Sequence, residues 1–212
     1  MAAKKGSITP RLAYVKRVYL DHAATTPVDP QVAEAMARVL QDTHGNPSSI
    51  YAEGRAAREL VDRAREEVAD ALGAQPTEIV FTSGGTEADN LALRGVMQAR
   101  RGLGDHLVTT AIEHHAVLDT ARDLESHGRA RLTVVGVEPD GRVDPAAIAA
   151  AIESKTTLVS VMHANNESGT IQPIAEIAAL CHDRGVKLHR TRCRRSARST
   201  STCGRSRWTS CP

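Results

Sequence analysis

The sequence predicts an α/β fold in which a mostly parallel sheet has helices on both faces. Short apolar runs typical of buried strands alternate along the chain with longer segments whose apolar residues recur at helical spacing. Polar clusters follow these runs and do not interrupt them. The predicted strands are residues 78–82, 106–110, 131–137, 157–162 and one that begins at residue 186.

Helices are predicted ahead of these strands and between them. Residues 53–73 carry one apolar stripe opposite a charged face, and Gly73 is expected to end this helix. Asp144 is a predicted N-cap with Pro145 at the first helical position. Further helices are predicted after Pro30, after the glycine pair at 84–85, and over residues 115–127, 144–152 and 174–185.

The composition is typical of a soluble globular protein and argues against several other classes. Of 212 residues, 41% are hydrophobic and 25% are charged, and the three Tyr, one Trp and one Phe are too few for a surface that stacks nucleic-acid bases. No long apolar run predicts a transmembrane helix, and the first residues lack the apolar core of a secretory signal. Cys181 is the single cysteine before residue 190, which suits a reducing compartment. We therefore expect a cytoplasmic protein with no membrane or nucleic-acid partner.

The charge is distributed unevenly and divides the chain. Residues 190–212 hold seven of the 27 basic side chains and none of the 25 acidic ones, so residues 1–189 carry a net charge of −5. This tail has no Val, Ile, Leu, Met or Phe whose burial could offset a backbone entropy cost of about 1–2 kcal/mol per ordered residue. We expect an N-terminal extension over 1–17, a domain over 18–189 and an aberrant, disordered basic tail over 190–212. A nucleic-acid binder acting through the tail is the alternative.

The sequence Ser83-Gly84-Gly85-Thr86 follows the predicted strand 78–82 and begins the next helix. Two glycines let the backbone turn sharply and approach a ligand, and the N-terminus of the helix favours a phosphate group. The hydroxyl of Thr86 adds a donor. The segment matches neither a Walker A loop nor a dinucleotide-binding fingerprint. It indicates a phosphate site, and the alternative is a plain glycine-rich turn.

The sequence Glu113-His114-His115 follows the predicted strand 106–110. Adjacent His side chains do not share one face of an element, and no Cys or Asp ligand set accompanies them, so no metal site is predicted. One His at the end of a strand could stack on a flat ligand or transfer protons. The alternative is a surface or core-edge His, because the chain has nine His residues.

A third polar cluster, residues 163–169, follows the predicted strand 157–162 and contains Asn165 and Asn166. An Asn side chain could bind a ring hydroxyl of a ligand, and the alternative is an Asx turn, which Asn165 could supply alone. All three clusters follow the carboxyl ends of predicted parallel strands, where open α/β sheets bind their ligands. The sequence therefore predicts one site built from separate segments at that edge.

Together and in this order, the motifs resemble those of the pyridoxal-phosphate-dependent cysteine desulfurases in the class V aminotransferase group. The matching stretches, over about residues 18–189, are YLDHAATTP, HGNPSS, EIVFTSGGTEADNLAL, EHHAVLDT and VSVMHANNESGTIQPI. The resemblance implies a fold type I enzyme, with residues 18–189 as an incomplete part of its large pyridoxal-phosphate-binding domain.

The resemblance also implies roles for individual residues. Gly85 and Thr86 would bind the cofactor phosphate, His114 would stack on the pyridine ring and move protons, and Asn166 would donate to the ring hydroxyl. Asn46 would lie near the substrate, L-cysteine, whose sulfur passes to an enzyme cysteine and leaves alanine. The implied partners are a second subunit in a homodimer and proteins that accept sulfur for iron–sulfur clusters or thio-cofactors.

The resemblance stops after His189. The family continues with an aspartate that pairs with the pyridinium nitrogen, where this chain has Thr191, and with a glutamine, where it has Arg194. The remaining residues do not match the segments with the Schiff-base lysine, the sulfur-accepting cysteine and the small domain. We therefore expect the chain as written to be a truncated and inactive cysteine desulfurase. The alternatives are another class V enzyme, such as a selenocysteine lyase, and a non-catalytic fragment.

A shifted reading frame near codon 190 accounts for this break. GC-rich codons chosen for residues 190–203, read one base earlier, encode TDAVQAVGKVDVDV, which restores the aspartate and the glutamine in register. We predict that restoring one base near codon 190 reopens a frame encoding the lysine and the small domain. Resequencing the genomic DNA checks this, and a stop codon soon after position 212 in the restored frame would contradict it.

Overall fold

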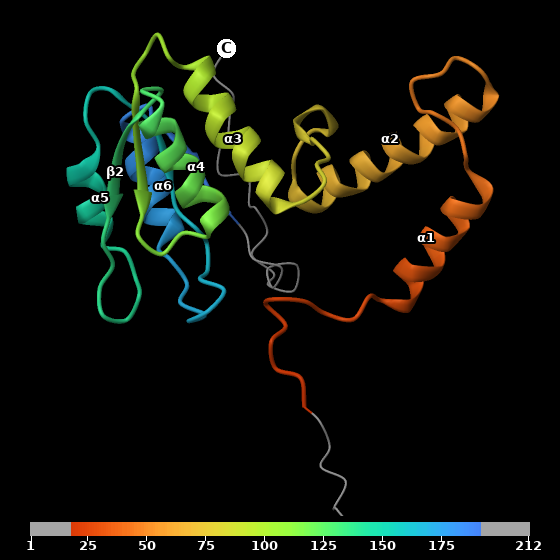
Figure 1. Cartoon of the computed structure of the whole chain (residues 1–212), viewed down its shortest axis with the longest axis horizontal. Coiled ribbons are helices and arrows are strands. Elements are labelled where there is room, and N and C mark those ends of the chain that lie inside the picture. Colours follow the sequence, from red (N-terminus) through yellow and green to blue (C-terminus); the bar gives the residue numbers. More distant parts are fainter. Residues whose placement is uncertain (1–17, 192–212) are drawn as a thin grey trace, which may run out of the picture.

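The chain forms an α/β unit and an N-terminal arm of two helices (Figure 1). The computed structural model describes residues 18–191. The arm consists of α1 (Pro30–Asp42) and α2 (Ala52–Leu72), and the short 3-10 helix η1 (Pro76–Glu78) follows it. In chain order, the α/β unit contains α3 (Gly85–Ala99), β1 (His106–Thr110), α4 (His115–Ser126), β2 (Arg131–Val135), α5 (Pro145–Ala151), β3 (Thr156–Ser160), α6 (Ile174–Asp183) and β4 (Lys187–His189).

The four strands form one parallel sheet in the order β2-β1-β3-β4, which confirms the predicted parallel arrangement. Leu107 of β1 lies opposite Leu132 of β2 and Leu158 of β3. The predicted strand 106–110 has the observed bounds, whereas the strand predicted at 131–137 ends two residues earlier and the strand predicted at 157–162 begins one residue earlier and ends two residues earlier. The predicted helices 53–73, 115–127, 144–152 and 174–185 are observed with ends within two residues.

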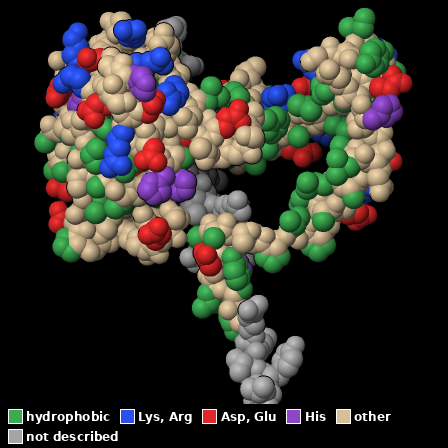
Figure 2. Space-filling model, in the orientation of Figure 1, with side chains coloured by type: hydrophobic (Ala, Val, Ile, Leu, Met, Phe, Trp, Pro, Cys, Tyr) green, Lys and Arg blue, Asp and Glu red, His purple; other side chains and the backbone are tan. Residues whose placement is uncertain are grey.

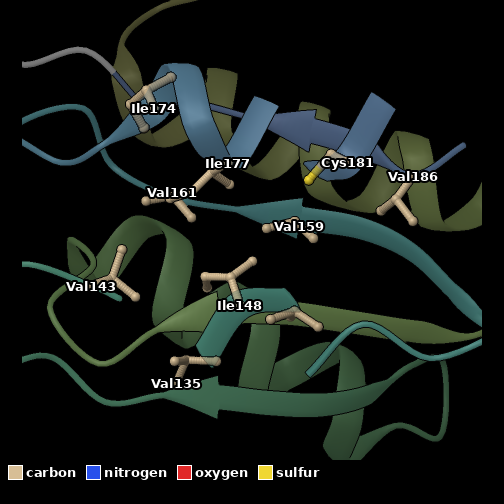
Figure 3. Close-up of a cluster of buried hydrophobic side chains, with 10 residues drawn as sticks. Val135, Val143, Ile148, Val159, Val161, Ile174, Ile177, Cys181 and Val186 are labelled. Carbon is tan, nitrogen blue, oxygen red and sulfur yellow. The ribbon is translucent and has the colours of Figure 1, made fainter. Parts of the chain in front are cut away.

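Helices cover both faces of the sheet, as the sequence predicts. Successive side chains of a strand point to opposite faces, so Leu107 and Leu158 pack with α3 and α4, whereas Val108 and Val159 pack with α5 and α6. Because each face meets a layer of helices, every residue of β1 and β3 is buried. Figure 3 shows the second layer, in which Ile148 of α5 faces the sheet.

The prediction of a strand at residues 78–82 is wrong in this structure. The helix η1 ends at Glu78, Ile79 is extended, and the segment belongs to no sheet of the described residues. Val80 is 68% exposed and Phe81 is 49% exposed. An extended segment becomes a strand only when a neighbour takes up its N–H and C=O groups, and none of β1 to β4 pairs with it. The apolar run indicated the backbone conformation but could not indicate a pairing partner.

Most large apolar side chains of the arm contact solvent (Figure 2), although Ala57 and Ala69 of α2 are buried. In α1 no residue is buried, and Met36 and Leu40 are 58% and 80% exposed. α2 ends as predicted, because Gly73 adopts a left-handed φ of 66° and its N–H donates to the carbonyl oxygens of Ala69 and Asp70. Figure 1 shows α1 and α2 extending away from the sheet, so their amphipathic pattern is not matched by a covering layer.

Two of the sequence-based assignments lie outside the described residues. They are the extension over residues 1–17 and, apart from its first two residues, the basic tail over residues 190–212, whose predicted disorder stays a prediction. The boundary of the partial domain at residues 18–189 also stays a prediction. Within residues 18–191, no helix has the length and apolar character needed to cross a membrane.

We predict that the exposed stripe of α1 makes the full chain self-associate, because burying apolar surface is worth about 25 cal/mol per Å². Replacing Met36 and Leu40 by Glu should weaken association by about tenfold or more, measured by sedimentation velocity over a concentration series. The control exchanges Gln31 and Gln41 for Glu, which adds the same charge to α1 without removing apolar surface. Equal association of the two variants would contradict the prediction.

Candidate functional site

The segment that begins α3 provides backbone donors. Gly84 precedes the helix, and the first backbone bond of the helix runs from the N–H of Ala88 to the carbonyl oxygen of Gly84. Helix geometry therefore leaves the N–H groups of Gly85, Thr86 and Glu87 without a carbonyl partner inside the helix. A Cβ atom built on Gly84 or Gly85 meets no other atom within 4 Å, so space is open beside the turn. These donors suit an anionic group.

Glu87 closes this turn through Ser83. The backbone N–H and the hydroxyl of Ser83 both donate to Oε2 of Glu87 at 2.7 Å. These hydrogen bonds, the hydroxyl first, hold the pKa of Glu87 below its ordinary value. Because both donors of Ser83 are already engaged, an anion at this turn would depend on the N–H groups of Gly85 and Thr86 and on the hydroxyl of Thr86.

His114 is the N-cap of α4. Its Nδ1 accepts a hydrogen bond from the backbone N–H of Ala116 at 3.1 Å. A neutral ring that accepts at Nδ1 carries its proton on Nε2, so the cap fixes both the orientation and the tautomer of the exposed imidazole. His115 lies differently, with its ring inclined at 70° to that of His114 and paired with Asp119 at 3.7 Å.

Asn165 and Asn166 have different environments. The Oδ1 of Asn165 accepts from the N–H groups of Glu167 and Ser168, both at 2.9 Å, and its Nδ2 donates to the carbonyl oxygen of Ile112 at 3.2 Å. The alternative considered for Asn165, an Asx turn, is therefore confirmed. Asn166 is exposed, and the side chain that closes the turn is that of Asn165. It stays available to a ligand.

Glu113 is buried between the ends of β1 and β3, with 7% of its surface exposed. Its Oε1 accepts from the N–H of Met162 at 2.6 Å and from the hydroxyl of Thr110 at 3.1 Å. Burial raises the pKa of Glu113 from 4.5 to about 7, although these two hydrogen bonds act against the shift. Its Oε2 is buried and has no hydrogen-bond partner among the described residues.

A second polar chain connects α3 to the sheet. Nε2 of His189 at the end of β4 lies 3.6 Å from Oδ1 of Asp89, and both side chains are 15% exposed. Nδ1 of His189 lies 2.9 Å from the hydroxyl of Ser160, which is fully buried in β3. The first part of α3 is thereby held against the ends of β3 and β4.

The structure brings most of the predicted site residues to one edge of the sheet, where the strands end. This carboxyl edge carries His114 after β1 and Asn166 after β3, and the bond from Asn165 to Ile112 joins the two segments. Gly85 and Thr86 also lie there, because α3 runs from this edge towards the amino end of β1.

Asn46 is not part of this group of residues. It lies in the turn between α1 and α2, at the part of the arm farthest from the sheet in Figure 1. There its Oδ1 accepts from the N–H of Ser48 at 2.9 Å. Its predicted place near a substrate stays a prediction. No group of three or more His, Cys, Asp or Glu side chains within residues 18–191 is arranged to hold a metal ion.

In the sequence, Glu113 stands out only as a neighbour of His114, and no pattern marks Asp89 or His189 as a site residue. The available signal for Glu113 was a carboxyl group shortly after a buried strand. Its main partner, Met162, is 49 residues away in the chain. Only the pairing of β1 with β3 makes that contact, so the spacing of residues could not indicate it.

The comparisons with known proteins agree with this fold. The family described as aminotransferase class-V matches residues 18–190. The chain belongs to this family of enzymes, whose members use pyridoxal phosphate, and both the predicted cofactor and the fold type I architecture are confirmed.

Several relatives of the chain are named cysteine desulfurases. The chain is 51% identical over 176 residues to an IscS-like cysteine desulfurase of Mycobacterium tuberculosis, covering 81% of this chain and 44% of the relative. It is 49% identical over 175 residues to a putative cysteine desulfurase, IscS 1, of Bacillus subtilis, covering 82% of this chain and 46% of the relative. The chain thus spans about half the length of the curated relatives it matches.

Two solved structures have the same architecture. A NifS-like protein superimposes with a TM-score of 0.78 at 38% identity, over 82% of this chain and 48% of its own. The structure titled SspA in complex with cysteine gives a TM-score of 0.77 at 39% identity, over 81% of this chain and 49% of its own. The resemblance to NifS-like and IscS-like cysteine desulfurases is therefore confirmed.

The residues at the carboxyl edge fit pyridoxal phosphate at both of its ends. The unbonded N–H groups of α3 and the hydroxyl of Thr86 suit the phosphate, and the exposed imidazole of His114 and amide of Asn166 suit the planar ring. An amine for a Schiff base is lacking at this edge within residues 18–191. The two lysines of that range, Lys155 and Lys187, lie at the amino ends of β3 and β4.

We predict that Thr86→Val lowers the affinity for pyridoxal 5′-phosphate by about tenfold, because a hydrogen bond to a charged group contributes about 1.5–3 kcal/mol. Isothermal titration calorimetry of the full chain measures its affinity for pyridoxal 5′-phosphate. A second titration with pyridoxal, which lacks the phosphate, gives the comparison. The control, Thr26→Val, changes an exposed hydroxyl in the segment before α1. Equal affinity for the two ligands in the unmodified chain would contradict the phosphate site.

We also predict that Glu113 makes stability depend on pH. Its folded pKa of about 7 lies above its ordinary 4.5, so the folded state binds more protons between these values. The contribution of Glu113 to the free energy of unfolding is complete below about pH 4.5 and is lost as pH rises through about 7. Its loss lowers the free energy of unfolding by about 2–4 kcal/mol.

Urea unfolding at pH 5 and pH 8 checks this prediction. Glu113→Gln should reduce the loss of stability between the two pH values, because it cannot ionise. The control is Glu125→Gln, since Glu125 also accepts from a backbone N–H, that of Leu132, but is exposed. A pH dependence that is the same in Glu113→Gln and the unmodified chain would contradict it.

Proposed function

We propose that the chain supplies the phosphate- and ring-binding part of a cysteine desulfurase, an enzyme that removes sulfur from L-cysteine and leaves L-alanine. The observation that carries the proposal is the carboxyl edge, where the start of α3, His114 and Asn166 come from three separate segments. All three lie in the region similar to proteins named cysteine desulfurases. A similar structure is titled as a complex with cysteine, which supports this amino acid as the substrate.

Each of these residues has a distinct task in the proposed site. The N–H groups of Gly85 and Thr86, with the Thr86 hydroxyl, bind and orient the phosphate. His114 stacks against the ring, and the proton that its neutral form can give is on Nε2, because Nδ1 accepts from Ala116. The amide of Asn166 donates to the ring hydroxyl. When bound, the cofactor supplies an electron sink for bonds at the substrate α-carbon.

Neither a sulfur-accepting thiol nor a covalent lysine, the two further groups of the proposed reaction, is available at the carboxyl edge within residues 18–191. Cys181 is 1% exposed in the core between α6 and the sheet, and burial raises the pKa of its thiol to about 11, so it does not act as a sulfur acceptor. The covalent lysine is also absent from this edge. The proposal includes a cytoplasmic location, a homodimer for the whole enzyme, and acceptor or scaffold proteins that receive its sulfur for iron–sulfur clusters or thio-cofactors.

We predict that the 212-residue chain alone does not convert cysteine to alanine and sulfide, even with pyridoxal phosphate present. The reason is that neither an anchoring lysine nor an accessible thiol is available at the described edge. Alanine and sulfide are measured after incubation with cysteine, and the His114→Ala variant is the control. Turnover by the unmodified chain that His114→Ala abolishes would show that this prediction is wrong.

A further inference from the structure

Glu113 connects the two segments that carry the ring-binding groups of the candidate site. It directly precedes His114, and its Oε1 accepts from the N–H of Met162, which lies three residues before Asn165. A second bond in the same place runs from Nδ2 of Asn165 to the carbonyl oxygen of Ile112. These two bonds are side-chain links between the loop before α4 and the turn after β3, so together they fix His114 relative to Asn166.

The environment of Glu113 favours a neutral carboxyl group. Its Oε2 is buried without a partner among the described residues, and an ionised group there would lose its hydration. The charged group that faces it from α3 is Asp89, which raises its pKa further and is itself paired with His189 of β4. From the sheet it meets the N–H of Met162 and the hydroxyl of Thr110. Two further titratable residues lie nearby: His114 follows Glu113 in the chain, and His163 follows its partner Met162.

We propose that Glu113 is a positioning residue that acts as a neutral carboxylic acid, holding the loop of His114 and the turn of Asn166 together at the ring end of the site. Glu113 does not touch the reacting atoms in this role. The inference rests on the proposed function, because the two groups it positions are those assigned to the pyridoxal phosphate ring.

Local opening of this link should respond to pH. Opening hydrates the carboxyl group and returns it to its ordinary pKa, so opening becomes easier as pH rises through the interval between 4.5 and about 7. By this linkage, the opening equilibrium should increase by about tenfold between pH 6 and pH 8. A side chain that only filled space would give no such dependence.

Two measurements on the full chain test the proposal. Amide hydrogen exchange at pH 6 and pH 8, corrected for intrinsic rates, gives the protection factor of the Met162 amide. Titration at pH 6 gives the affinity for pyridoxal 5′-phosphate. The variants are Glu113→Gln, which keeps an acceptor and cannot ionise, Glu113→Ala, which removes the link, and Glu125→Gln as the exposed control.

The expected result is a protection factor that falls by about tenfold between pH 6 and pH 8 in the unmodified chain and in Glu125→Gln, but stays constant in Glu113→Gln. Glu113→Ala should lose protection at both pH values and bind pyridoxal 5′-phosphate at least about tenfold more weakly, while Glu113→Gln binds within about twofold of the unmodified chain.

Equal pH dependence of Met162 protection in the unmodified chain and Glu113→Gln would overturn the proposal. So would Glu113→Ala binding the cofactor as tightly as the unmodified chain. If Glu113→Ala does not fold, the pH dependence of Met162 protection in the unmodified chain and in Glu113→Gln still tests the proposal. Failure of the unmodified chain to bind pyridoxal 5′-phosphate would reject the proposed function, whereas the exchange measurement would still show whether Glu113 forms the link.

Discussion

Burial of β1 and β3 on both faces is the constraint on which the rest of the α/β unit depends. The backbone groups of these strands are paired within the sheet, and their side chains alternate between two helical layers. Burying one aliphatic side chain such as Leu107 or Val159 contributes about 1.5–3 kcal/mol, so leaving either face uncovered would cost much of the stability of a domain. The helices must therefore cross the sheet between successive strands.

The position of the site follows from these crossings. Each crossing helix begins at the edge where the preceding strand ends, so the N-termini of helices and the polar turns collect there. Polar groups buried at this edge need partners. Glu113 accepts a hydrogen bond from the backbone N–H of Met162, and Asn165 donates one to the backbone carbonyl of Ile112, so each side chain is a partner for the backbone of the neighbouring segment. The residues that follow them in the chain, His114 and Asn166, stay exposed and can contact a ligand. In each pair, the first residue therefore holds the structure and the second is available for binding.

The two helices of the arm form as regular helices, but most of their large apolar side chains stay exposed. No layer of the described residues covers the apolar stripe of α1 or the apolar residues Val80 and Phe81, and in the stripe of α2 only the small residues Ala57 and Ala69 are buried. The local conformation of α1 and α2 is nevertheless well formed, since Asp29 caps α1 and Gly73 ends α2. Helix formation depends on neighbours in the chain, whereas burial depends on a second surface. The chain spans about half the length of its curated relatives, which also have the segments that it does not match.

The sequence by itself determined the four strands of the sheet, the helix boundaries at Gly73 and Asp144, and the polar clusters that directly follow β1 and β3, because these depend on periodicity and on bonds between residues close in the chain. It left open whether Asn165 or Asn166 was structural, and it assigned a strand to residues 78–82 that has no partner. Tertiary structure decided these points, and it alone produced the contacts of Glu113 with Met162 and of Asp89 with His189. Such contacts join segments far apart in the chain, and only strand pairing and helix packing set the distances between them.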